Sequence, residues 1–324
     1  MEMPDDTDEL DETPYDDWTR TGTKTNERVR TVEDKKDRRK KMRERIELLR
    51  RIRDIRWKVS SPEEPKVEKV VSVEVQEVEP EEKEDEYIEP HDGRPSSKLV
   101  NSIGMRLNLI SPGSFIMGSK RWSESQPVRR VNIRRPFYIS IFPVTQKEWK
   151  SVLGNNPSYP KGDYLPVVNV SWNDCHKFIM KLNALEGSLR YRLPTEAEWE
   201  FAARAGSTGR YSFGDDVSKL PLYAWLGEDW DVGELHPVGL KRSNEWGLYD
   251  VHGNIWEWCQ DNWHPNFNGA PADGRAWEGG VDVNRVRRGG TWTHDPEHCE
   301  TAHRNRNGAG YRYKYLGFRI VRSI

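Results

Sequence analysis

Four metal-ligating or nucleophilic side chains lie close together near the C-terminus, at His294, His298, Cys299 and His303. Imidazole nitrogens and thiolates are the ligands that zinc and several transition metals prefer. The surrounding residues are polar and include no evident groups to orient such ligands, which is more typical of a displayed loop than of a metal centre. A metal cluster is therefore the weaker of two interpretations of this stretch.

Two acidic residues flank a predicted tight turn in Gly247–Cys259 (GLYDVHGNIWEWC). Gly253-Asn254 fits the turn, and the alternating aromatic residues after it predict a strand. The turn would bring Asp250 and Glu257 close to free backbone carbonyls, which is an oxygen ligand set that suits calcium. The alternative is a helix-capping aspartate and a surface glutamate.

Residues 285–324 begin and end with stretches typical of buried strands and are polar in between. Tyrosine supplies a large contact area at low entropic cost, and asparagine, glycine and histidine supply adaptable hydrogen bonds. Such residues do not build a core, so the composition predicts a displayed ligand-binding surface. Its candidate residues are Thr293, His294, Asp295, His298, His303, Asn305, Asn307, Tyr311, Tyr313 and Tyr315.

Three helices with N-terminal capping boxes are predicted ahead of this segment. In each box a Ser or Thr is followed three residues later by an acidic residue, and the two side chains satisfy the first free N–H groups of the helix. Apolar residues at helical spacing follow each box, and a glycine ends each helix. The boxes are Thr145 with Glu148, Ser171 with Asp174, and Thr195 with Glu198, and the glycines are Gly154, Gly187 and Gly206.

Strand signals open the domain and loop signals dominate its second half. Ser111–Ser114 (SPGS) predicts a hairpin between two short strands, and 137–144 predicts a further strand. After residue 206 the helix signals disappear, and glycine, proline, asparagine and aromatic residues prevail. Long loops of this kind must be held by aromatic packing or by a metal ion. The pattern indicates an α+β, loop-rich domain at 97–324.

The first 96 residues have a different composition. Residues 1–23 are acidic and predict a disordered tail. Residues 24–58 are basic and predict a helix whose narrow apolar stripe could pack against a partner or a second copy of the chain. A nucleic-acid-binding arm is the alternative, which interspersed acidic residues disfavour. Residues 59–96 predict a Val/Glu edge strand followed by an acidic linker.

The whole-chain composition excludes several classes of partner. The net charge is only -2, which gives no reason to expect nucleic acid. No apolar run approaches the roughly 20 residues of a membrane span, and the N-terminus lacks the features of a signal peptide. Three cysteines in a chain of 324 residues do not suggest a disulfide framework. We therefore expect a soluble protein that is cytoplasmic when synthesised and has no membrane partner.

A series of ordered motifs resembles the formylglycine-generating-enzyme (sulfatase-modifying factor) domain family. They are Asn101–Ser119, Pro136–Trp149, Pro166–Cys175, Tyr191–Gly206, Asn244–Trp258 and the RRGGTW, RNR and GFR segments of residues 287–319. The resemblance spans 97–324 and implies the family's variant of the C-type lectin fold, with structural calcium. By position, the calcium ligands would be Asp250, Gly253, Ile255 and Glu257. The family's second calcium loop has no convincing match around Tyr223–Glu228.

One departure from the family decides the expected activity. The resemblance implies an oxidase that holds copper with two cysteines five residues apart, and the matching positions here are His294 and Cys299. A single cysteine does not provide paired thiolates. The sequence therefore predicts that the chain is not an enzyme and has no redox cofactor.

The C-terminal segment resembles the variable region of proteins that a retroelement diversifies by replacing adenines in template Asn codons. The residue types reachable from such codons fill the polar positions, between framework residues at 288–290, 304, 306 and 317–319. This favours a non-catalytic display protein that binds an unidentified protein or cell-surface ligand through its variable region. The alternative is a formylglycine-generating oxidase, or a related metal-dependent oxygenase, that acts on a Cys-containing substrate through Cys299. A third interpretation is a scaffold that acts through the basic arm.

Overall fold

The structure is a computed structural model that describes residues 96–227, 234–280 and 283–324. The described residues all belong to one compact unit of the chain. The acidic tail, the basic helix and the Val/Glu strand predicted within residues 1–95 lie outside the described residues. The same holds for the acidic linker, apart from its last residue.

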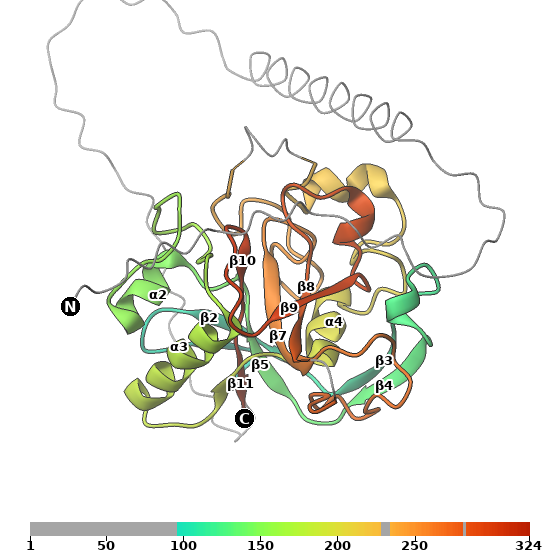
Figure 1. Cartoon of the computed structure of the whole chain (residues 1–324), viewed down its shortest axis with the longest axis horizontal. Coiled ribbons are helices and arrows are strands. Elements are labelled where there is room, and N and C mark those ends of the chain that lie inside the picture. Colours follow the sequence, from blue (N-terminus) through green and yellow to red (C-terminus); the bar gives the residue numbers. More distant parts are fainter. Residues whose placement is uncertain (1–95, 228–233, 281–282) are drawn as a thin grey trace, which may run out of the picture. The chain divides into compact units, whose positions relative to one another are not determined.

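The strands of the described residues form three sheets (Figure 1). A five-stranded sheet has the order β1-β2-β5-β11-β6, with antiparallel neighbours. These strands are Lys98–Val100, Arg106–Ile110, Phe137–Ser140, Val321–Ser323 and Tyr191–Arg192. A four-stranded sheet has the order β10-β7-β8-β9, built from Leu316–Gly317, Trp256–Asn262, Asn284–Arg288 and Arg304–Gly308. Strands β3 (Gly113–Met117) and β4 (Arg129–Ile133) pair separately.

The three predicted helices are confirmed, and each begins with the predicted capping box. They are α2 (Gln146–Leu153), α3 (Trp172–Leu185) and α4 (Glu196–Arg204). Short 3-10 turns lie at Ser123–Ser125 (η1), Val217–Leu222 (η2) and Pro296–Cys299 (η3). The apolar stripe of α3 is buried as predicted, whereas α4 is buried on every side and carries its acidic residues into the interior.

The hairpin predicted at Ser111–Ser114 is wrong. The chain does turn there, but β2 pairs with β1 and β5, while β3 pairs with β4 in a different sheet. Ile110 at the end of β2 pairs with Phe137 of β5, and Gly113 at the start of β3 pairs with Ile133 of β4. The partners therefore come from farther along the chain, and the local turn signal did not decide the pairing.

Two aromatic-rich cores hold the loops in place. In the first, Trp149 of α2 stacks on Phe178 of α3, and both rings meet Phe318 edge-on. In the second, apolar side chains of α4 share one cluster with those of β3 and β4 and with Trp263, which follows β7. Since β11 lies between β5 and β6, the C-terminal segment leaves the four-stranded sheet and ends inside the first sheet. The loop that carries η3 lies above the upper ends of β7 and β8 in Figure 1.

Candidate functional site

The predicted ligand-binding residues fall on the segment 293–315, here called the display segment, which runs from the loop after β8 to the start of β10. Three of its histidines contact one another. The ring centroids of His294 and His298 are 5.2 Å apart, and those of His298 and His303 are 4.9 Å apart. The rings also pack on Trp122 and Trp256, at 4.6 Å from Trp122 to His303 and 5.4 Å from Trp256 to His294. We call His294, His298 and His303 the histidine cluster.

Two members of the histidine cluster, His294 and His303, are held in their neutral form. Burial lowers the pKa of His294 to about 3, with further lowering by His298 and Arg287. Burial also lowers the pKa of His303 well below its usual value, again with help from His298. In the part of the chain that the structure describes, no group of three or more His, Cys, Asp or Glu residues could hold a metal ion. The weaker interpretation of this stretch, a metal cluster, is therefore not supported.

The structure also disfavours the thiol chemistry that a copper-dependent oxidase would require. Cys299 is buried, and burial raises the pKa of its thiol, so that it stays protonated. A Cβ atom at Gly290 would lie 2.8 Å from its sulfur, so the backbone itself covers the thiol. Cys175 and Cys259 are buried and form no disulfide. A buried, protonated and single thiol is a poor copper ligand and a poor nucleophile.

The three tyrosines of the display segment lie at different depths. Tyr311 is 39% exposed and Tyr313 is half-buried, with ring centroids 5.7 Å apart. Tyr315 is only 3% exposed, packs edge-on against Trp292 and belongs to the first core. The prediction of Tyr315 as a surface residue is wrong, because the chain enters the first core at this point, just before β10.

His303 is likewise buried, which corrects its placement on the surface. It lies just before β9, where the chain enters the sheet, and its ring is closed in by Trp122 and Trp256. Asp295 is exposed, and Thr293 is half-buried with its hydroxyl 2.8 Å from that of Thr291. The predicted ligand-binding residues therefore fall into two sets: an exposed or half-buried outer group, and a buried layer beneath it.

Asn305 and Asn307 are half-buried and alternate along β9. In the antiparallel register Asn305 lies opposite Arg287 and Asn307 lies opposite Arg285, so the four side chains share one face of the sheet. The two arginines also sit on aromatic rings, with the Arg285 guanidinium 4.0 Å from the centre of the Trp172 ring. This face is therefore polar and aromatic, as expected for a binding surface.

Buried glutamates that sequence reasoning missed anchor the strands that flank this segment. Glu196 of α4 binds Arg304 through two bonds of 2.7 Å each, and its Oε1 lies 3.1 Å from Nε of Arg288. Glu200, one turn farther along α4, binds Arg288 and Arg204. Although burial raises it, the two arginines lower the pKa of Glu200 below its usual value. Glu196 and Glu200 lie four positions apart on one helix face, a spacing that surface residues also have, so the sequence did not reveal their burial.

Arg288 in turn holds the backbone of the display segment, and Arg304 joins this segment to backbone outside it. Arg288 donates to the carbonyls of Thr301 and His303, each at 2.9 Å. Arg304 donates to the carbonyls of Glu124 and His264, at 2.9 and 3.0 Å. Buried charges that are paired and hydrogen-bonded in this way fix one geometry. The loop is therefore positioned by framework side chains rather than by the residues it displays.

A third buried pair bears on the predicted calcium site at Asp250, Gly253, Ile255 and Glu257. Both Glu257 oxygens accept hydrogen bonds from Arg319, at 2.6 and 2.7 Å, and Oε2 also accepts from the Trp199 indole at 2.6 Å. A cation at Glu257 would compete with that guanidinium. In this arrangement Glu257 does not fit as a calcium ligand.

Asp250 fits a cation better. It is buried in a left-handed conformation with φ of 59°, its Oδ2 accepts from the Gly239 N–H, and its Oδ1 has no hydrogen bond. Burial raises its pKa to about 6. Gly253 approaches Trp225 so closely that a Cβ would lie 2.2 Å from the Trp225 carbonyl oxygen. The calcium assignment stays a prediction, and it rests on Asp250 rather than on Glu257.

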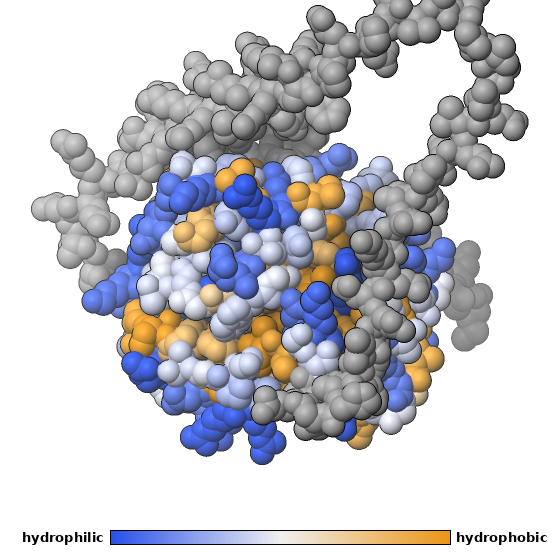
Figure 2. Space-filling view, turned by 180° about the vertical axis from the view of Figure 1, so that it is seen from behind, coloured by the Kyte–Doolittle hydropathy of each residue, from blue (hydrophilic) through white to orange (hydrophobic). Residues whose placement is uncertain are grey.

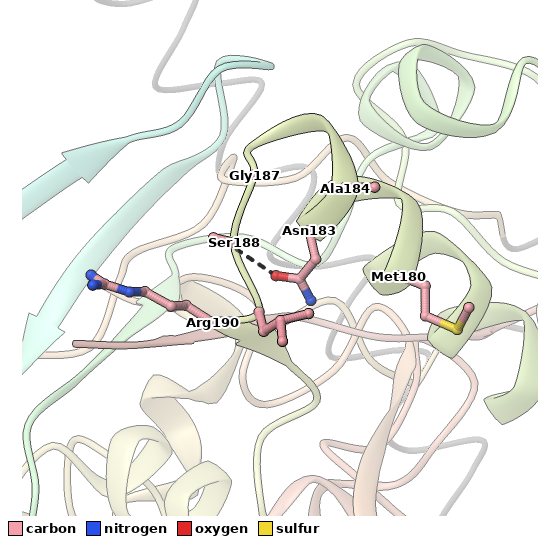
Figure 3. Close-up of a pocket in the computed structure, with 7 residues that line it drawn as sticks. Met180, Asn183, Ala184, Gly187, Ser188 and Arg190 are labelled. Atoms are coloured by element: carbon pink, nitrogen blue, oxygen red, sulfur yellow. Dashed lines mark hydrogen bonds between the residues drawn. The ribbon is translucent and has the colours of Figure 1, made fainter.

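A shallow groove of about 700 Å³ lies at the C-terminal end of α3 (Figure 3). Met180 and Asn183 of α3 line one side and residues 187–190 line the other. The display segment touches the opposite end of this helix, where Arg312 binds Asp174 at 2.8 Å. Asp174 lies six to nine residues before Met180 and Asn183, which corresponds to roughly 9 to 14 Å along the helix. Hydrophobic patches also occur on the side shown in Figure 2, so apolar surface does not single out the groove.

Comparison with known proteins decides the family. The model of the sulfatase-modifying factor enzyme 1-like domain matches residues 101–324. The chain belongs to this family. A formylglycine-generating enzyme of Streptomyces coelicolor is 35% identical over 172 residues, which cover 48% of this chain and 52% of the enzyme. The match therefore spans about half the length of that enzyme.

Two solved structures share the sulfatase-modifying factor fold. PvdO from Pseudomonas aeruginosa has a TM-score of 0.64 at 29% identity, and the match covers 71% of this chain and 99% of that chain. Treponema denticola variable protein 1 has a TM-score of 0.63 at 28% identity, over 70% of this chain and 98% of that chain. The mixed, loop-rich domain thus has the formylglycine-generating-enzyme type of C-type lectin-like fold. None of the helices in the described residues is long and apolar enough to cross a membrane.

Proposed function

We propose that this protein is a non-catalytic ligand-binding display protein whose segment 285–324 is diversified by a retroelement. The observation that carries the proposal is that this segment contains two kinds of side chain: buried arginines that anchor it, and side chains between them that do not. Arg288, Arg304 and Arg319 are buried in ion pairs with glutamates of α4 and β7. The side chains between them can therefore change without loss of the anchors.

The proposed contact residues are the outer members of the display segment. They are Thr293, His294, Asp295, His298, Asn305, Asn307, Tyr311 and Tyr313, with His303 and Tyr315 as the layer beneath. Aromatic and small polar side chains on a rigid support are typical of binding surfaces whose sequence varies. The similarity to a variable protein of Treponema denticola supports this function. The ligand is expected to be a protein or a cell-surface molecule.

The decisive test of diversification is genomic. We expect a reverse-transcriptase gene near the coding sequence, together with a near-repeat of the 285–324 segment that differs at adenines. In a sequenced population, substitutions should gather at the outer positions and spare the codons of Arg288, Arg304 and Arg319. A locus without such a repeat would contradict the proposal.

The alternative function is that of a formylglycine-generating oxidase or a related metal-dependent oxygenase. Similarity to the Streptomyces coelicolor enzyme favours it, while the buried single thiol of Cys299 disfavours it. We expect no conversion of a Cys-containing peptide in the presence of copper and oxygen. Turnover by the parent protein that is lost in Cys299→Ser would establish the enzyme instead.

A further inference from the structure

The histidine cluster joins three separate points of the display segment. His294 follows the turn after β8, His298 lies in η3 and His303 precedes β9. Their rings form one contact series between Trp122 and Trp256. Separating these rings requires the loop 291–303 to open, so the cluster is a closure contact of that loop.

The charged groups that face the cluster do not favour a positive charge within it. On β8, the Arg287 guanidinium lies 4.7 Å from the centre of the Trp256 ring. The positive charges of Arg288 and Arg287 lower the pKa of His303, and that of Arg287 also lowers the pKa of His294. Protonating one imidazole also disfavours protonation of the next. Like charges in a dry site shift titration in this direction.

The carboxylates of the same loop are exposed or engaged elsewhere. Glu300 accepts from the Trp122 indole at 3.0 Å and lies 3.3 Å from Arg121. Glu297 lies 3.9 Å from Arg121, and Asp295 is exposed. Burial raises the pKa of Glu300, so this residue also titrates as the pH falls.

We propose that His294, His298 and His303 form an acid-responsive lock on the display segment. Neutral imidazoles close the loop 291–303, and their protonation opens it and releases bound ligand. Only the release of ligand rests on the proposed display function. Opening of the loop is a property of the chain alone and can be measured without a ligand.

Proton linkage gives the direction in which acid shifts the equilibrium between the closed and the open loop. The opened loop exposes histidines of ordinary pKa, about 6.5, whereas the closed loop binds protons only at lower pH. Below about pH 6 the open form therefore holds more protons, and acid shifts the population toward it. If opening takes up two protons, the open population rises by up to about 100-fold per pH unit.

The test is hydrogen exchange of the full chain at pH 7.5 and pH 5, corrected for the intrinsic dependence of exchange on pH. Peptides that cover 291–303 should show at least about a 10-fold larger opening ratio at pH 5, whereas peptides from α3 should not change. The double variant His298→Phe/His303→Phe keeps aromatic rings, removes two of the three titrating groups and retains His294 and Glu300. It should weaken the acid response.

Two further variants complete the design. His298→Gln replaces a half-buried member alone and should weaken the response if the double variant does not fold. His176→Phe, whose ring packs on Trp172 outside the cluster, should behave like the parent protein. An unchanged loop in the parent, an equal response in the double variant, or simultaneous opening of α3 would overturn the lock. None of these outcomes bears on whether the segment is diversified.

Discussion

The C-terminal segment carries two groups of arginines that differ in their surroundings. Arg288, Arg304 and Arg319 are almost fully buried, and each is paired with a glutamate. Arg312, by contrast, has a side chain that is 51% exposed and pairs with Asp174 at the surface. An exposed pair is screened by water and contributes little, whereas a buried arginine without its partner is costly. Residues of one type thus serve as anchors or as part of the displayed surface, according to burial.

The difference shows how the proposed variable segment can coexist with a unique fold. The anchors act on the backbone, because Arg288 donates to the carbonyls of Thr301 and His303, and Arg304 donates to carbonyls outside the loop, those of Glu124 and His264. The loop conformation therefore depends on framework side chains that lie far apart in the sequence. Exchange of the outer side chains changes the surface and leaves these bonds intact.

The largest expected effect comes from breaking an anchor. Glu200→Ala leaves Arg288 and Arg204 without one of their carboxylates in a buried site, and should lower the free energy of unfolding by about 3 to 5 kcal/mol. Glu297→Ala in the display segment is the matched control, since its pair with Arg121 is half-exposed. That change should cost less than about 1 kcal/mol. Urea denaturation of both variants checks the comparison, and equal losses would contradict it.

Two tyrosines of the display segment, one buried and one exposed, test the same comparison. Tyr315→Ala removes a core ring and should cost about 3 kcal/mol of stability. Tyr311→Ala removes an exposed ring and should cost less than about 0.5 kcal/mol. Thermal and urea unfolding of the two single variants measure the difference. If Tyr311→Ala were as destabilising as Tyr315→Ala, the outer surface would have been assigned incorrectly.

The smallest expected effect concerns calcium. A cation bound through Asp250 should stabilise the folded state by about 2.7 kcal/mol when the free ion is at 100 times its dissociation constant, and EDTA should remove that gain. Asp250→Asn should abolish the response to EDTA. Glu257→Ala should destabilise the protein with or without EDTA, because its partner is Arg319. A melting midpoint that EDTA does not move would remove the calcium assignment.

Short-range patterns in the sequence were sufficient to predict part of this fold. The capping boxes at Thr145, Ser171 and Thr195 involve residues three positions apart, so the sequence alone locates the helix starts. The buried stripe of α3 follows from helical periodicity in the same way. The presence of one cysteine where an oxidase needs two is also a property of the sequence.

Burial of polar groups was decided only by the tertiary structure. Glu196 meets Arg304 across 108 positions of the chain, and Glu200 meets Arg288 across 88. No local pattern distinguishes these glutamates from surface residues, because a buried charge is tolerated only where a distant partner satisfies it. The same reason explains Tyr315 and His303, whose polar neighbours in sequence suggested a surface. Their burial depends on Trp292, Trp122 and Trp256, which the fold brings to them.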